Sequence, residues 1–147
     1  MKIAFISAEW HSELVQIAVN ACLQALVSAG YSEGQLDRFT VPGSLEIPLL
    51  AQKCTQSGRY EGVLAFGLVV DGGIYRHDFV GQAVIDGLMR VQLDSGVPVL
   101  SCVMTPHHFH EHDIHHAFFQ AHLFEKGQET AKALLGFLKA SAQISAS

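Results

Sequence analysis

The sequence lacks a long apolar run, a signal-peptide pattern at its N-terminus and any run of lysine or arginine. A membrane-spanning helix needs about 20 successive apolar residues, and no segment approaches that length. The first residues also lack the long apolar stretch and cleavage site of a secretory signal. Because the net charge is −5 and basic side chains are not clustered, neither nucleic acid nor an anionic membrane is expected as a partner. The sequence therefore predicts a cytoplasmic protein.

Cysteine and charged residues are also scarce. The three cysteines, Cys22, Cys54 and Cys102, lie far apart without a C-x-x-C pair, which argues against a disulfide framework and predicts buried free thiols. Charged residues make up 16% of the chain and hydrophobic residues 49%. A small domain keeps much of its surface in water, so this apolar fraction is high for a monomer of 147 residues. Part of the apolar surface is therefore expected to lie in contacts between subunits.

Apolar runs and helical patterns alternate along the chain, with no repeat or linker that would divide it. Strands are predicted at about 3–8, 63–70 and 97–104, together with a second strand whose end lies at 39–41. Helices are predicted at about 11–29, 46–57, 79–93 and from beyond 106 to 140. Uninterrupted apolar strands such as VLAFGLVV at 63–70 are typical of a parallel sheet that is covered on both faces. We expect one α/β domain over 1–147, a three-layer α/β/α arrangement with a four-stranded parallel sheet. Residues 141–147 are expected to fray.

Ligands of such sheets bind beyond the carboxyl ends of the strands, and chemically versatile residues follow the predicted strand ends. Trp10, the only tryptophan, either packs on the sheet edge or offers a flat face for stacking a heteroaromatic ring. Ser44 and Glu46 open a predicted helix, whose free N–H groups can bind an acceptor or an anion. Alternatively, Ser44 caps that helix and Glu46 merely favours its first turn.

The segment 71–78, DGGIYRHD, is the richest of these loops. Its two glycines allow the backbone to approach a ligand closely, and the start of the following helix suits a phosphate. Arg76 supplies a fixed cation, and His77 adds an imidazole, the side-chain type most used for proton transfer at neutral pH. A plain turn would need the glycines but not two adjacent basic side chains, so we interpret the loop as functional.

Six histidines gather between residues 107 and 116: His107, His108, His110, His112, His115 and His116. Some pairs share a helical face, which makes a metal site one interpretation. However, the H-E-x-x-H zinc motif is incomplete because Ile114 stands four residues after His110, and no cysteine lies nearby. A subunit contact or contact with a phosphate is the favoured interpretation, and no metal ion is expected.

Four segments together resemble lumazine synthase, in order and over nearly the whole chain: VPGSLEIP (41–48), GLVVDGGIYRHDFV (67–80), VPVL (97–100) and EKGQETA (125–131). The Pro-Gly-x-x-Glu-x-Pro turn is specific, whereas VPVL is weak alone. The resemblance implies a flavodoxin-like fold and a transferase of riboflavin biosynthesis. That family condenses 5-amino-6-(D-ribitylamino)uracil with 3,4-dihydroxy-2-butanone 4-phosphate to 6,7-dimethyl-8-ribityllumazine. It uses no metal or organic cofactor and forms pentameric rings with active sites between neighbours.

Matched by position, the resemblance implies a set of substrate-binding residues: Trp10, His11, Ser44, Leu45, Glu46, Leu68, Val69, Val70, Gly73, Ile74, Ser101, His115 and His116. Trp10, the strand end 68–70 and Ser101 would meet the pyrimidine. The turn 44–46 would meet the ribityl chain and the ring, and residues 73–74 the butanone phosphate. We expect Trp10 and the 71–78 loop to face each other across two neighbouring copies of the chain.

Two departures separate this chain from the common form of the family. Arg76 stands where that form has its catalytic histidine, with His77 one residue later, and both are predicted to be catalytic. The usual phosphate-binding arginine is absent, and His115 or His116 lies nearest to its position. DGGIYRHD together with Trp10 is similar to the divergent type II branch, whose assemblies are decamers of two facing pentamers.

Two other functions fit the same pattern less well. The replaced histidine and the missing arginine motivate a non-catalytic flavin- or lumazine-binding module. A flavodoxin-like response regulator would need an acidic cluster at the strand ends, where only Glu9 and Asp71 occur, without a matching lysine.

Overall fold

The computed structural model describes residues 1–70, 76–106 and 113–145, apart from the side chains of 113–116. Its elements follow in the order β1 (Lys2–Ala8), α1 (Ser12–Ser28), η1 (Glu33–Gln35), β2 (Leu36–Val41), η2 (Ser44–Glu46), α2 (Ile47–Gln56), β3 (Tyr60–Leu68), α3 (His77–Ser95), β4 (Val99–Met104) and α4 (Asp113–Ser145), where η marks a short 3₁₀ helix. No helix within these described ranges is both long and apolar enough to span a bilayer.

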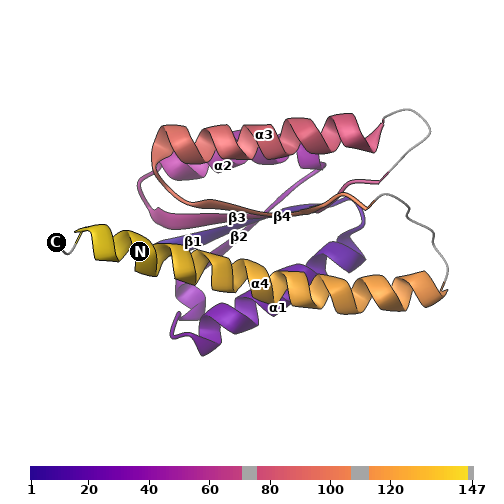
Figure 1. Cartoon of the computed structure of the whole chain (residues 1–147), viewed down its shortest axis with the longest axis horizontal. Coiled ribbons are helices and arrows are strands. Elements are labelled where there is room, and N and C mark those ends of the chain that lie inside the picture. Colours follow the sequence, from indigo (N-terminus) through magenta and orange to yellow (C-terminus); the bar gives the residue numbers. More distant parts are fainter. Residues whose placement is uncertain (71–75, 107–112, 146–147) are drawn as a thin grey trace.

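The four strands form one parallel sheet in the order β2-β1-β3-β4 (Figure 1). The helices α2 and α3 cover one face of this sheet, and α1 and α4 cover the other. This arrangement confirms the three-layer α/β/α prediction, and the strand order is that of flavodoxin-like folds. The N-terminus and the C-terminal end of α4 lie at the end of the molecule where β1 begins.

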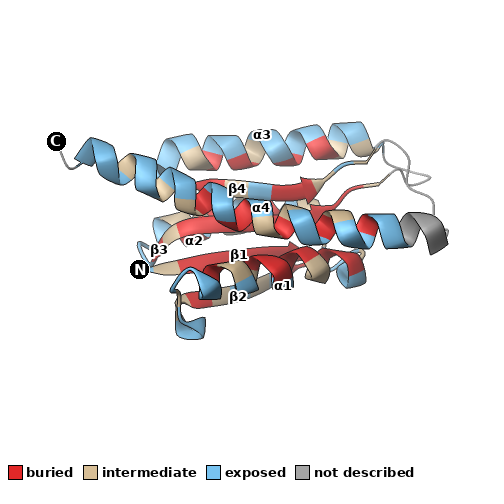
Figure 2. Cartoon of the chain, turned by 60° about the horizontal axis from the view of Figure 1, so that its bottom comes forward, coloured by how far each residue is buried: buried red, intermediate tan, exposed pale blue. Residues whose placement is uncertain are grey.

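A hydrophobic core fills the space on each side of the sheet, as the burial pattern shows (Figure 2). Between the sheet and the pair α1 and α4, the rings of Phe5 and Phe66 stack with their centroids 5.7 Å apart. On the other face, Ile47 of α2 and Val84 of α3 are fully buried against the strands. The apolar runs of β1 and β3 arise because both faces of these central strands are covered.

Several element boundaries differ from those predicted. β3 ends at Leu68 rather than Val70, although Val69 N–H still donates to the Met104 carbonyl at 2.8 Å. β4 begins at Val99 rather than Val97, because Pro98 has no N–H to donate and contributes only its carbonyl, which accepts from Val63 at 2.9 Å.

The helices depart from the prediction in a similar way. α3 begins at His77, two residues before the predicted start, so His77 lies in its first turn. α4 continues to Ser145, so the residues from 141 to 145, which were expected to fray, are helical. Pro48 lies in the first turn of α2, where its missing N–H removes no helical hydrogen bond.

Candidate active site

A cavity of about 360 Å³ lies at the carboxyl ends of the central strands, where the sequence placed the site. It is lined by Trp10, His11, Gly43, Ser44, Leu45, Glu46, Leu68, Val69, Val70, His77 and Val80. The loop after β1, the turn after β2, the end of β3 and the start of α3 thus converge on one hollow. Nine of these eleven residues are among those predicted from the sequence.

Trp10 forms one wall of the cavity, and its side chain is 68% exposed. It therefore does not pack on the sheet edge, and its indole face is open to a ligand. The next residue, His11, has φ of 58°, a left-handed conformation that few residues other than glycine adopt. The carbonyl of His11 accepts the N–H groups of Leu14 and Val15, both at 3.0 Å, so the start of α1 holds this bend in place.

The turn η2 forms another part of the cavity wall. Its N-cap residue is Gly43, so the interpretation of Ser44 as the helix cap is wrong. Instead, Glu46 closes the turn, because its Oε1 accepts the Gly43 N–H at 2.8 Å. The fully buried Ile47 then anchors the following helix against the sheet. The turn is thus fixed on both sides, and one oxygen of the Glu46 carboxylate already accepts a hydrogen bond from the backbone of the turn.

The two predicted catalytic residues have different positions at the start of α3. His77 lines the cavity. Arg76 does not: its guanidinium donates to the Asp78 carboxylate at 2.8 Å and lies 4.4 Å from the centroid of the Phe79 ring. The Arg76 side chain is 67% exposed, so this ion pair is open to solvent and binds the arginine only weakly.

Trp10 and His77 line the same cavity within a single chain. The expectation that the indole and this part of the loop belong to two neighbouring copies is therefore wrong. Two loops that are far apart in the sequence meet here because the carboxyl ends of parallel strands lie at one edge of the sheet.

Ser101 lies apart from the cavity. It lines a second hollow of about 320 Å³ between the edge strand β4 and α4, together with Lys126, Glu129 and Thr130. Lys126 donates to Glu129 at 3.0 Å. The prediction of Ser101 as a residue of the same pocket therefore does not hold within one chain, because β4 forms the far edge of the sheet from β2.

Four predicted substrate contacts cannot be placed. Gly73 and Ile74 lie outside the described residues, as do the histidines from 107 to 112. His115 and His116 belong to α4, but their side chains are not described. Among the described side chains, no three His, Cys, Asp or Glu residues come together to hold a metal ion.

Sequence reasoning missed Gly43, Val80 and the Lys126 hollow as site features. Val80 follows His77 by three residues and so lies on the same face of α3, a spacing that could have identified it. Lys126 could have been found from its place in the EKGQETA segment, but nothing in the sequence alone indicates that it shares a hollow with Ser101.

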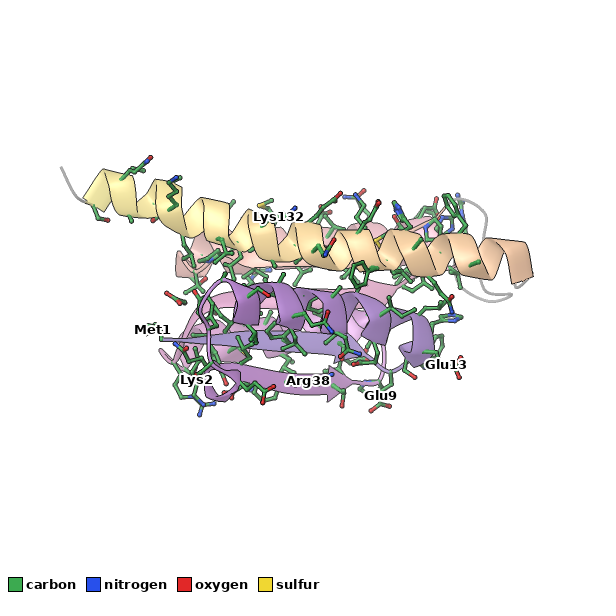
Figure 3. All side chains as sticks on the ribbon, turned by 90° about the horizontal axis from the view of Figure 1, so that it is seen from below. Met1, Lys2, Glu9, Glu13, Arg38 and Lys132 are labelled. Carbon is green, nitrogen blue, oxygen red and sulfur yellow. The ribbon has the colours of Figure 1, made fainter. Side chains whose placement is uncertain are left out.

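Of the two acidic residues considered for a phosphoacceptor site, Asp71 lies outside the described residues and only Glu9 can be placed. Glu9 lies at the carboxyl end of the sheet near Glu13, on the side of the molecule away from Met1 and Lys2 (Figure 3). Neither carboxylate lines the cavity. The described residues thus give no support to the response-regulator interpretation.

The strand order and the cavity define a flavodoxin-like α/β protein with a small-molecule pocket at the carboxyl ends of its strands. A family model described as 6,7-dimethyl-8-ribityllumazine synthase matches residues 1–141. The chain therefore belongs to the 6,7-dimethyl-8-ribityllumazine synthase family.

Curated relatives support this assignment. A protein from Rhodococcus erythropolis named 6,7-dimethyl-8-ribityllumazine synthase is 56% identical over 133 residues, covering 90% of this chain and 86% of that protein. Proteins named 6,7-dimethyl-8-ribityllumazine synthase 2 are also similar. The one from Pseudomonas syringae pv. tomato is 47% identical over 89% of this chain and 77% of its own length. The one from Bradyrhizobium diazoefficiens is 45% identical over 99% of this chain and 89% of its own length.

Proposed function

We propose that the chain condenses 5-amino-6-(D-ribitylamino)uracil with 3,4-dihydroxy-2-butanone 4-phosphate, a transferase reaction that yields 6,7-dimethyl-8-ribityllumazine for riboflavin biosynthesis. The observation that carries this proposal is the match to the synthase family together with a cavity that collects the residues expected at the family's site. The relatives described above are named as synthases, and their names give no support to a non-catalytic flavin-binding module.

The cavity suits a flat heteroaromatic ring with a polar chain. The pyrimidine stacks on the exposed indole of Trp10, and the apolar strand end at Leu68 and Val69 forms the floor beneath it. The ribityl hydroxyls reach the turn η2, where the backbone and the Glu46 carboxylate offer hydrogen-bonding groups. These contacts hold the 5-amino group of the pyrimidine in a fixed position for attack on the butanone carbonyl.

The reaction then needs little beyond positioning and proton transfer. Attack of the amine on the carbonyl and loss of one water give an imine. Removal of the proton on C3 of the butanone and loss of inorganic phosphate from C4 give an enol, which tautomerises to a ketone at C3. Attack of the ribitylamino nitrogen on this new carbonyl and loss of a second water close the ring. His77 borders the cavity, and an imidazole can both accept and donate a proton, so His77 is the proposed proton shuttle for these steps.

Arg76 has a separate proposed role. A guanidinium keeps its proton at physiological pH and therefore binds a phosphate rather than transferring protons. Its exposed ion pair with Asp78 is weak, so the side chain can exchange this partner for the phosphate of the butanone. Gly73, Ile74, His115 and His116 stay proposed contacts of the same phosphate end of the site.

We propose that subunits assemble as a pentamer or as a decamer of two pentamers. The open wall of the cavity at Trp10 supports an arrangement in which a neighbouring copy covers it. The hollow that contains Ser101 and Lys126 is a suitable covering surface, because it supplies a hydroxyl for the pyrimidine and a cation for the phosphate. The free thiols of all three cysteines support a reducing cytoplasmic location.

The test is to mix the purified protein with both substrates and follow the fluorescence of the lumazine product. The wild-type chain should form product, His77→Ala should lower kcat at least fivefold, and Arg76→Ala should mainly raise KM for the butanone phosphate. Arg90→Ala is the matched control, because Arg90 also lies exposed on α3 and pairs with an aspartate, Asp94. Absence of product from the wild-type protein rejects the proposed reaction; unchanged kinetics in both loop variants reject only their roles.

A further inference from the structure

The side chain of Ser44 rests directly on Gly67 of β3. A Cβ atom built on Gly67 would lie 2.7 Å from the Ser44 Oγ. The next nearest atoms, Ala8 Cβ and Ile47 Cδ1, would lie at 3.7 Å, an ordinary van der Waals distance. The space that a residue at position 67 would need is therefore taken by one atom, the serine hydroxyl oxygen of the cavity wall.

Gly67 is not required by the backbone. Glycines with positive φ in the described chain are Gly30, Gly58 and Gly96, and Gly67 is not among them. It pairs with Val103 in the regular ladder between β3 and β4. A glycine weakens a buried strand unless a bulge or a close neighbour requires it. Here the close neighbour is the turn η2.

From these contacts we infer that Gly67 is a positioning residue for the site assigned under the proposed function, on which this inference rests. Because Gly67 has no side chain, Ser44 packs directly against β3, and this contact determines the distance between η2 and β3. The next residue of β3, Leu68, lines the same cavity as Ser44, Leu45 and Glu46. The distance between the floor of the cavity and the wall that meets the pyrimidine and its ribityl chain is therefore set at Gly67.

A methyl group at this position would meet the Ser44 hydroxyl, which can rotate, whereas the turn that carries it is held at both ends. Its N-terminal end is closed by the hydrogen bond from Gly43 to Glu46, and its C-terminal end continues into the fully buried Ile47. A methyl group at position 67 must either turn the serine hydroxyl away from the sheet or lift η2. Both changes alter the wall that contacts the substrate, and a misplacement of about 1 Å can cost on the order of 100-fold in rate.

A double-mutant cycle in the full-length protein tests this positioning role. The variants are Gly67→Ala, Ser44→Ala and the two combined, with kcat and KM for the pyrimidine measured by product fluorescence. We expect Gly67→Ala to raise KM for the pyrimidine at least fivefold in the wild-type background, with a smaller change in kcat. In the Ser44→Ala background, Gly67→Ala should raise KM for the pyrimidine less than twofold, because the obstructing oxygen is gone. Gly34→Ala is the control, since a Cβ there would meet nothing within 4 Å.

The rescue separates positioning from a general loss of stability. Should Gly67→Ala fold poorly, the double variant must recover both folding, measured by thermal unfolding, and KM. An equal effect of Gly67→Ala in both backgrounds, or no effect in the wild-type background, overturns the inference while leaving the proposed function in place. If the wild-type protein forms no product, the proposed function fails. The coupling is then measured on binding of the pyrimidine alone. Non-additive effects of the two substitutions on its Kd support the positioning role of Gly67, and additive effects overturn it.

Discussion

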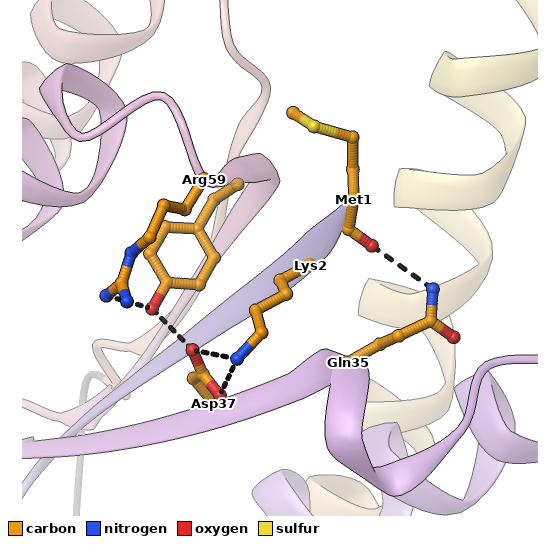
Figure 4. Close-up of polar contacts among 6 residues, drawn as sticks. Met1, Lys2, Gln35, Asp37 and Arg59 are labelled. Carbon is orange, nitrogen blue, oxygen red and sulfur yellow. Dashed lines mark hydrogen bonds and ion pairs between the residues drawn. The ribbon is translucent and has the colours of Figure 1, made fainter.

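Four polar side chains form a network at the end of the sheet opposite the cavity (Figure 4). The Asp37 carboxylate accepts from the Tyr60 hydroxyl at 2.6 Å and from Lys2 Nζ at 3.2 Å, while Arg59 donates to the tyrosine oxygen at 3.1 Å. The hydrogen bond from Tyr60 and the Lys2 cation lower the pKa of Asp37. Burial and the hydrogen bond to Asp37 raise the pKa of Tyr60 to about 12. The folded state thus favours an ionised Asp37 and a protonated Tyr60, and the network stabilises the fold while both groups are in these forms.

Removing the tyrosine hydroxyl should lower stability in a pH-dependent way. At pH 7, Tyr60→Phe should reduce the free energy of unfolding by about 1–2 kcal/mol, because a hydrogen bond to a charged acceptor is lost. A lowered carboxyl pKa contributes stability above its unfolded value, which is lost as pH falls through the folded pKa. The difference between variant and wild type should therefore shrink in acid, as measured by urea unfolding at several pH values. A constant difference down to pH 2 would contradict the coupling to Asp37.

The same network predicts a second loss of stability in alkali. A raised pKa contributes stability that is complete below the unfolded value and is lost as pH rises through the folded value, here about 12 for Tyr60. The wild-type protein should therefore lose stability between roughly pH 10, where an unperturbed tyrosine titrates, and pH 12, and Tyr60→Phe should lose less over that interval. Circular dichroism at increasing pH checks this expectation.

The cysteine thiols should be unreactive in the folded protein. Burial raises the pKa of the Cys22 thiol to about 12 and also raises the pKa of Cys54 and Cys102. Because the thiolate is the reactive form, iodoacetamide at pH 8 should modify none of the three within minutes and all three after unfolding in guanidinium. Mass spectrometry counts the added groups. Rapid modification of any thiol in the native state would show that the core opens there.

At the scale of elements, the crossing of α1 and α4 depends on one glycine. A Cβ on Gly127 would collide with the carbonyl oxygen of Ala18 and lie 2.9 Å from Ala21 Cβ. Figure 3 shows the two helices lying side by side. A backbone carbonyl cannot rotate away as a side chain can, so the helices must separate to admit a methyl group.

Gly127→Ala should therefore lower the free energy of unfolding by about 1–3 kcal/mol, as overpacking does, even though alanine favours helices. Gly136→Ala on the same helix should instead raise stability by up to about 1 kcal/mol, because its Cβ would meet nothing within 4 Å. Urea unfolding followed by circular dichroism compares the two variants. Similar effects at both positions would argue against the close crossing.

The existence of the strands and helices could be predicted from the sequence better than their first and last residues. Uninterrupted apolar runs identified the covered strands, and their alternation with helices predicted the parallel sheet. The start of α3 at His77 and the extension of α4 to Ser145 depend on local backbone geometry that apolar periodicity does not report. The strand order was also beyond the sequence pattern, because alternation does not specify the edge on which each crossover places its strand.

The candidate site was predictable for a related reason. Residues after three strands, such as Trp10, Ser44 and Val70, had to meet once the sheet was parallel. Ser101 lies inside an edge strand, and its partners Lys126 and Glu129 come from a helix packed beside that strand. Such a grouping depends on tertiary packing, so only the structure could reveal it.

At the scale of the whole molecule, one chain leaves many large apolar side chains uncovered. Ile85, Met89 and Leu93 follow one another at four-residue intervals along α3, with exposures of 37%, 51% and 75%. An exposed apolar stripe of this kind is typical of a protein–protein interface. Part of the apolar content of the sequence thus lies on the surface of the folded chain, where contacts between subunits could cover it.

Sedimentation equilibrium should therefore give a mass of several 16.0 kDa subunits, five or ten if the proposed assembly is correct. Replacing Met89 by glutamate should shift the mass toward that of a single chain, because a charge in the stripe cannot be buried without a partner. Far-UV circular dichroism verifies that the variant stays folded. A wild-type protein that sediments as a monomer at micromolar concentration would exclude assembly through this stripe.

The placement of the two chain ends has a practical consequence. The N-terminus and the C-terminal end of α4 lie where β1 begins, and the cavity opens where the strands finish (Figure 1). A purification tag, a tether to a solid support or a second enzyme joined to either end would extend from the back of the subunit. Its linker would not cross the mouth of the cavity, so the domain offers two attachment points for engineering that leave substrate entry unobstructed.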